Sequence, residues 1–179
     1  MIKHFSVLYV GHIALENLGR DGTPADERCY PNERLVEAMA MAEDVAREMD
    51  DLGYDTLWLA EHHFQREGYE CIPNLILMGT YLATQTKRLK FGGAFNVTTM
   101  WNPIRLAEDY AMADYLTNGR VVFGVGRGYH TREVESLGGP LLDAEANAAM
   151  FREQMDILFK AFDQERWSHR GRYYTIPAD

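Results

Sequence analysis

Apolar positions along the chain alternate between two spacings. Short apolar runs, typical of buried strands, lie at residues 5–10, 54–60, 89–97 and 120–125. Longer segments with apolar residues three or four positions apart, typical of amphipathic helices, lie at 32–52, at 73–86, between Asn102 and Asn118, and at 143–162. The last three strands start roughly one β/α unit apart, and this spacing predicts a parallel sheet with right-handed crossovers.

Residues that favour helix ends support these boundaries. Asn102 followed by Pro103 is typical of a helix start, and Asn118 followed by Gly119 is typical of a helix end. Gly53 is expected to end the helix at 32–52, because glycine adopts the left-handed conformation that closes a helix.

Four β/α units allow two architectures. They can form a small doubly wound domain, or half of a (β/α)8 barrel, which typically needs about 250 residues. Residues 167–176 are typical of an extended or hairpin insertion, and the 179-residue sequence then stops without a closing element. We therefore expect a single domain over residues 1–179 whose barrel is interrupted after its fourth β/α unit.

The composition of the chain limits which partners and which cellular location can be expected. A formal charge of -9, with no basic run, disfavours nucleic acid. Cys29 and Cys71 match no metal-binding spacing and are expected to be reduced thiols. The apolar segment at 5–10 is too short for a signal peptide, and no apolar stretch approaches the ~18 residues of a membrane span. These features predict a cytoplasmic protein with no membrane or nucleic-acid partner.

The chemistry-bearing cluster Glu61-His62-His63-Phe64 directly follows the strand predicted at 54–60. In β/α proteins, reactive groups gather where parallel strands end. Adjacent histidines point to opposite sides of a strand and no His-x-His is present, so no metal site is expected. Either His62 or His63 could instead face the barrel mouth as a general base, or both could only bind local backbone. The clustering favours a functional role for one of the pair.

Two glycine-rich strand ends offer ligand contacts. In the first, Gly124-Val125-Gly126-Arg127-Gly128, backbone can approach a ligand closely and Arg127 can bind a phosphate or carboxylate. A tight turn with a solvated arginine explains this segment about equally well. In the second, residues 92–97, the small side chains leave room for a planar ligand that Phe95 and Asn96 could contact, or they serve packing alone.

Together these segments resemble the luciferase-like flavin monooxygenases, the family of bacterial luciferase. The resemblance is carried by residues 53–64, by 89–94, by 102–109, and by 114–120 running into 124–128. The segment at 167–175 is also similar to the region that follows the fourth helix of this family. Four blocks in the same order are hard to obtain by chance.

The resemblance implies the N-terminal half of a TIM (β/α)8 barrel that uses reduced FMN and O2, through a peroxyflavin, to oxidise a small organic substrate. The reduced flavin commonly comes from a separate reductase. His62 would be the catalytic acid/base, and Glu61 would hold the polar network near the flavin. Ala94 and Phe95, often joined by a cis peptide in this family, would pack behind the isoalloxazine ring, and Arg127 would reach the flavin phosphate.

The resemblance also leaves alternatives open. Bacterial luciferase has small residues where this chain has Phe95, and relatives are roughly twice as long. The same superfamily contains dehydrogenases that use the deazaflavin F420, and a half barrel could be non-catalytic. Related dimers pack the helix at 73–86 and the next helix against a partner, so we expect a homodimer through Leu77, Met78, Tyr81 and parts of 104–116.

Overall fold

A four-stranded parallel sheet forms the centre of the computed structural model, which describes residues 2–15 and 28–177. The strand order is β1-β2-β3-β5, so each β/α unit adds its strand beside the previous one. The strands are β1 (Ser6–Tyr9), β2 (Thr56–Leu59), β3 (Lys90–Gly93) and β5 (Val121–Val122). The predicted parallel sheet is confirmed.

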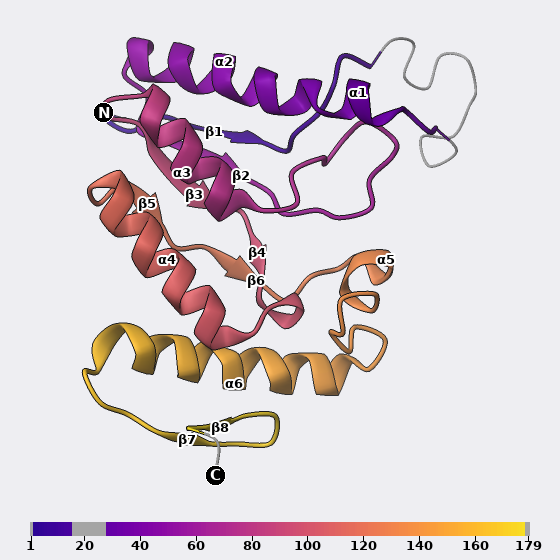
Figure 1. The fold of residues 1–179 in the computed structure, drawn as a ribbon, viewed down its shortest axis with the longest axis vertical. Coiled ribbons are helices and arrows are strands. Elements are labelled where there is room, and N and C mark those ends of the chain that lie inside the picture. The colour runs from indigo at the N-terminus through magenta and orange to yellow at the C-terminus, as the bar shows by residue number, and fades with distance from the viewer. Residues whose placement is uncertain (1, 16–27, 178–179) are drawn as a thin grey trace.

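The helices follow the strands in alternation and pack side by side, α2 on α3, α3 on α4 and α4 on α6 (Figure 1). They are α1 (Asn32–Leu35), α2 (Glu37–Leu52), α3 (Leu75–Gln85), α4 (Pro103–Thr117), α5 (Thr131–Val134) and α6 (Ala144–Asp163). The single helix expected at 32–52 is divided at Val36, and the short α5 was not expected.

The predicted helix ends are confirmed by their geometry. The Asn102 side chain accepts hydrogen bonds from the backbone N–H groups of Ile104 and Arg105, which open α4. Asn118 ends α4 in the left-handed conformation at φ 58°, and Gly53 ends α2 at φ 79°. These local signals fix where each helix starts and stops, because they satisfy backbone groups that the helix itself leaves unpaired.

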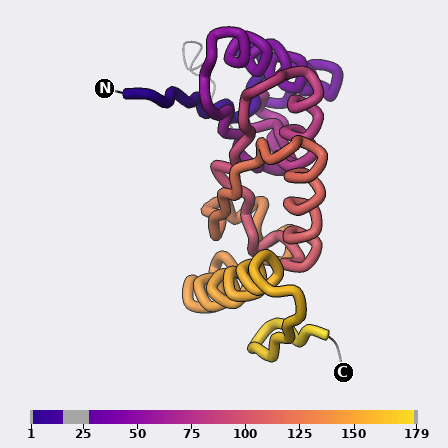
Figure 2. The backbone as a smooth tube through the Cα atoms, turned by 90° about the vertical axis from the view of Figure 1, so that its left-hand side faces the viewer, coloured from indigo at the N-terminus to yellow at the C-terminus, as the bar shows by residue number. Residues whose placement is uncertain are grey.

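The two faces of the sheet differ in what covers them. On one face, the paired residues Val7, Leu57, Phe91 and Val121 pack into the apolar core beneath the helices. On the other face, Leu8 is 55% exposed. Figure 2 shows α3 and α4 along one side of the strands only. The uncovered face corresponds to the interior of a barrel, so the chain forms a partial (β/α) barrel.

The third and fourth strands are each interrupted before they reach the site. After β3, the chain resumes as β4 (Asn96–Val97), and after β5 it resumes as β6 (Val125–Gly126), which pairs with β4 in parallel. The expected cis peptide joins Ala94 to Phe95 at the first break. At the second break, a side chain on Gly124 would collide with the Gly93 carbonyl oxygen, so glycine permits the close approach of the two backbones.

The C-terminal segment is an antiparallel hairpin of β7 (His169–Arg170) and β8 (Thr175–Ile176), as expected for residues 167–176. The Glu153 carboxylate on α6 accepts hydrogen bonds from the backbone N–H groups of Arg172, Tyr173 and Tyr174. Burial raises the pKa of Glu153, but these hydrogen bonds outweigh it and lower the pKa below its ordinary value. A charged carboxylate therefore holds the hairpin against α6.

Within residues 2–15 and 28–177, no helix combines the length and the apolar character that a membrane crossing requires. The cytoplasmic location expected from the sequence stays a prediction.

Candidate functional site

Glu61 connects the end of β2 to the two neighbouring segments of the sheet. The residue is 1% exposed. One oxygen, Oε2, accepts hydrogen bonds from Asn96 Nδ2 at 2.9 Å and from the Val97 backbone N–H at 2.7 Å. The other, Oε1, accepts one from the Trp101 indole N–H at 2.6 Å and contacts His63 Nε2 at 3.2 Å. Four partners for one buried carboxylate fix the ends of β2 and β4 relative to each other.

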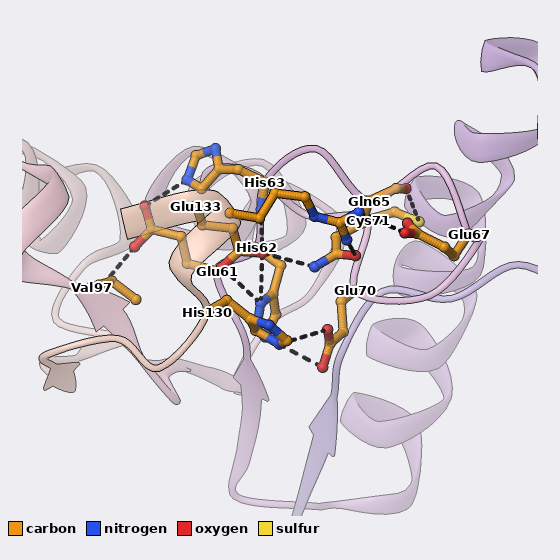
Figure 3. A network of polar contacts seen from close by, with 11 residues as sticks. Glu61, His62, His63, Gln65, Glu67, Glu70, Cys71, Val97, His130 and Glu133 are labelled. Atoms are coloured by element: carbon orange, nitrogen blue, oxygen red, sulfur yellow. Dashed lines mark hydrogen bonds and ion pairs between the residues drawn. The ribbon is translucent and has the colours of Figure 1, made fainter. Parts of the chain in front are cut away.

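His62 follows the end of β2 and is 7% exposed, and its ring contacts other residues than the His63 ring does. Its Nδ1 lies 3.1 Å from Glu133 Oε1, and its Nε2 lies 3.5 Å from Glu70 Oε1. Figure 3 shows the imidazole between these two carboxylates. A carboxylate only accepts hydrogen bonds, so Nδ1 donates to Glu133 and the tautomer of His62 is set by that contact.

Glu133 comes from α5 and is buried at the centre of a second network. It accepts hydrogen bonds from the backbone N–H of His63 at 3.0 Å and from Gln65 Nε2 at 2.8 Å, in addition to His62. Burial raises the pKa of Glu133, but hydrogen bonds from His62, His63 and Gln65 together lower it below its ordinary value. Glu133 is therefore a charged partner that holds His62 in one orientation.

A pocket of about 200 Å³ opens on the uncovered face of the sheet. Its lining includes most of the residues that the sequence pointed to, namely Glu61, His62, Ala94, Phe95 and Gly128. The Phe95 ring is exposed beside the small side chain of Ala94. The polar residues at the end of β2 and the apolar segment after β3 therefore share one pocket.

The two other candidate residues, Asn96 and Arg127, lie outside the lining of that pocket. Asn96 is fully buried, with its amide nitrogen donated to Glu61 and its amide oxygen accepting the hydroxyl of Tyr110 at 2.7 Å. Both ends of this side chain are thus committed to positioning Glu61. Arg127 is exposed beside the pocket, and its backbone carbonyl accepts a hydrogen bond from the Thr99 hydroxyl.

Sequence reasoning missed the residues that surround His62, which are Glu70, Tyr129, His130 and Glu133. Glu70 comes from the long segment between β2 and α3, and the others follow β6. One signal was present, because Tyr129, His130 and Glu133 directly follow the glycine-rich end of the fourth strand, where β/α proteins place functional groups.

The partial barrel and its strand-end pocket place the chain among the (β/α)8-barrel proteins. A family model described as luciferase-like monooxygenase matches residues 12–179, and the chain belongs to this family. It is 30% identical, over 125 residues, to the oxygenase component of the flavin-dependent trigonelline monooxygenase of Acinetobacter baylyi, a match that covers 70% of this chain and 34% of that protein.

Two further comparisons extend these matches, one in sequence and one in fold. The chain is 28% identical over 145 residues to the F420-dependent glucose-6-phosphate dehydrogenase of Amycolatopsis mediterranei, which covers 79% of this chain and 41% of the dehydrogenase. The fold of this chain is similar to that of the oxygenating constituent of 3,6-diketocamphane monooxygenase from Pseudomonas putida, whose structure was solved in complex with FMN. The TM-score is 0.77 at 23% identity, and the match covers 98% of this chain and 43% of that chain. The chain thus spans less than half the length of these proteins.

Proposed function

We propose that the chain is part of an FMN-dependent monooxygenase that oxidises a small organic substrate with O2, and that it carries the catalytic acid/base of that enzyme. The observation that carries the proposal is that the buried, hydrogen-bonded pair of Glu133 and His62 lines the same pocket as Ala94 and Phe95. An exposed aromatic ring and a small side chain suit the flat face of a flavin, and the imidazole beside them suits proton transfer. Reduced FMN, when bound, would supply the electrons that activate O2.

His62 is the proposed catalytic residue. Because Glu133 holds Nδ1, proton transfer falls to the second nitrogen, Nε2, which lies 3.5 Å from Glu70 Oε1 in the lining of the pocket. Glu61 acts through its neighbours, since its oxygens bind Asn96, Val97 and Trp101 and so hold the wall of the pocket in place. Arg127 and the Gly128 backbone would approach the flavin phosphate from the exposed rim of the pocket.

A separate reductase would deliver the reduced flavin. The relative from Acinetobacter baylyi is an oxygenase component, a name that implies a partner protein for that enzyme. The second candidate function is an F420-dependent oxidoreductase, which the relative from Amycolatopsis mediterranei favours. The third is a half barrel without catalytic activity. Reconstitution with each cofactor, followed by the absorption spectrum of the protein-bound species, distinguishes FMN from F420 and from no binding.

A homodimer is part of the proposal. Leu77 and Tyr81 on α3, and Met112 and Leu116 on α4, are exposed side chains, and a groove of about 200 Å³ runs between the two helices. Monomeric proteins rarely leave large apolar patches open to water. Met78, which the sequence placed in this surface, is instead buried in the core under α3.

The test of the catalytic assignment compares two neighbouring histidines in a form of the enzyme that turns over reduced FMN. His62→Ala should lower turnover by about 10²-fold or more, the usual contribution of a general acid/base, while FMN affinity stays nearly unchanged. His63→Ala, which removes a contact with Glu61 and leaves the His62–Glu133 pair in place, should have a smaller effect. Equal and small effects of both variants would show that the pair is structural.

A further inference from the structure

Three potential metal ligands meet beside the pocket, although they lie far apart in the sequence. His62 follows β2, Glu70 lies in the segment between β2 and α3, and His130 directly precedes α5. Glu70 Oε1 lies 3.5 Å from His62 Nε2, and Glu70 Oε2 lies 3.8 Å from His130 Nε2. Figure 3 shows both imidazoles turned toward the Glu70 carboxylate.

These separations suit one small cation. Zn²⁺ binds imidazole nitrogen and carboxylate oxygen at about 2.0–2.2 Å, so the ligand atoms of a tetrahedral site are about 3.4 Å apart. One ligand atom from each of the three residues lies within 4.8 Å of the other two. Movements of about 1 Å in the Glu70 and His130 side chains would therefore close the set around His62, and side chains reach that scale without backbone change.

The surroundings of the cluster are those of a metal site. Histidine ligands of metals usually donate their other ring N–H to a carboxylate, which directs the free nitrogen to the metal, and Glu133 does this for His62 at 3.1 Å. Glu70 Oε2 is buried and has no hydrogen-bond partner within residues 2–15 and 28–177. A buried carboxylate oxygen without a partner is costly, and a bound cation would remove that cost.

We propose that His62, Glu70 and His130 bind a divalent transition-metal ion, with Zn²⁺ the best match. Two imidazoles and one carboxylate are a ligand set that zinc uses, and three protein ligands leave a fourth position for water. The His130 side chain is 38% exposed, so an ion can enter from solvent. This proposal departs from the expectation that the sequence holds no metal site, because that expectation considered only His62, His63 and a His-x-His pair. His130 is a different partner that only the fold brings close to His62.

Metal binding has a regulatory consequence, which rests on the proposed monooxygenase function. A metal on His62 Nε2 occupies the lone pair that proton transfer requires. Zn²⁺ therefore inhibits turnover, and removal of the ion by a chelator restores it. The site lets the concentration of free zinc control an oxygen-consuming reaction.

The first experiment measures binding by the 179-residue chain without any flavin. Zn²⁺ is titrated in competition with a chromophoric chelator, under a reductant that does not bind zinc. We expect one equivalent to bind, and His130→Ala and Glu70→Gln each to weaken binding by at least about tenfold. Circular dichroism of each variant confirms that it is folded.

Matched controls separate this site from adventitious binding. His63→Ala removes the neighbouring histidine, and Cys29→Ser removes an exposed thiol. Both variants should bind Zn²⁺ as tightly as the unmodified chain. Unchanged affinity in His130→Ala, or loss of binding in Cys29→Ser, would overturn the proposal.

Co²⁺ provides an independent spectroscopic check. Cobalt bound by imidazole and carboxylate gives visible d–d absorption without the thiolate charge-transfer band that cysteine ligands produce. That spectrum, lost in His130→Ala, supports the site, whereas a thiolate band would assign the metal to Cys71 or Cys29.

Two results distinguish the metal site from the proposed function. If His62→Ala and His130→Ala both weaken Zn²⁺ binding but Zn²⁺ does not slow a flavin-dependent turnover, the metal site stands and the acid/base role of His62 is wrong. If His62→Ala abolishes turnover and no Zn²⁺ binds, the proposed function stands and the metal site is wrong.

Discussion

Glu61→Gln is the substitution that best tests how the site is held together. Glutamine has nearly the same shape as glutamate but offers one acceptor oxygen and one donor NH2 group in place of two acceptors. In the native chain, Oε2 accepts from Asn96 and Val97, and Oε1 from Trp101 and His63. The new NH2 group must therefore face donors on one side of the side chain.

The structure indicates which of the two orientations of the glutamine amide leaves fewer buried donors without an acceptor. If the NH2 group faces Asn96 and the Val97 backbone N–H, two buried donors lose their acceptor. If it faces the other pair, His63 can present its unprotonated Nε2 as an acceptor, and only the Trp101 indole N–H is left without a partner. A buried donor left unsatisfied costs about 1–3 kcal/mol, so Glu61→Gln should lower the free energy of unfolding by that amount.

Glu61→Ala removes every acceptor at this position, and we expect it to cost more than about 4 kcal/mol. Urea unfolding followed by tryptophan fluorescence measures both effects. The matched control is Glu108→Gln, which breaks an exposed ion pair with Arg105 on α4 and should change stability by less than about 0.5 kcal/mol. If Glu61→Gln were as mild as this control, the hydrogen bonds of Glu61 would not hold the strand ends together.

Three other properties of the chain can be tested: its affinity for FMN, the pH dependence of its C-terminal hairpin and its oligomeric state. Because the pocket of about 200 Å³ is smaller than the roughly 300–1,000 Å³ of typical cofactor sites, the 179-residue chain alone should bind FMN weakly, and a submicromolar dissociation constant in a fluorescence titration would contradict this. The pKa of Glu153 is lower in the folded than in the unfolded chain, so its stabilising effect is present above its ordinary value of 4.5 and is lost as the pH falls through the folded pKa. Amide-exchange protection of Tyr173 and Tyr174 should therefore fall with acidification, and Glu153→Gln should weaken it at neutral pH and remove most of its pH dependence. Leu77→Glu should convert the expected homodimer to monomer in light scattering, whereas Leu142→Glu, at another exposed position, should not; a native monomer at micromolar concentration would refute the dimer.

The order of strands and helices could be predicted from the sequence because each depends on neighbouring residues. The apolar run at 54–60 contains β2, and the spacing of Ala42, Ala46 and Met49 places the buried side of α2. The caps at Asn102 and Asn118 satisfy backbone groups only two to four residues away, so they can be recognised in any context. The family resemblance and the pairing of Ala94 with Phe95 were recognised for the same reason, since each is carried by contiguous residues.

The breaks in the third and fourth strands could not be predicted from the sequence and are seen only in the tertiary structure. The segments at 89–97 and 120–125 each read as one strand, yet both divide into two short strands. Both divisions lie where Gly93 approaches Gly124, a contact between residues that lie far apart in the sequence. Periodicity carries no information about such a contact, because it reports only which side of one element is apolar.

The environment of His62 shows most clearly that local sequence does not reveal contacts between distant residues. The sequence identified His62 as a candidate and indicated that His63 points away from it, which follows from the alternation of a strand. It did not indicate that Glu133, 71 positions later, would bind Nδ1, or that Glu70 and His130 would lie beside Nε2. The sequence by itself therefore determined which residue types stand at the ends of the strands. The packing of successive β/α units decided which of them meet, because distances between strand ends depend on sheet register and helix packing and not on local sequence.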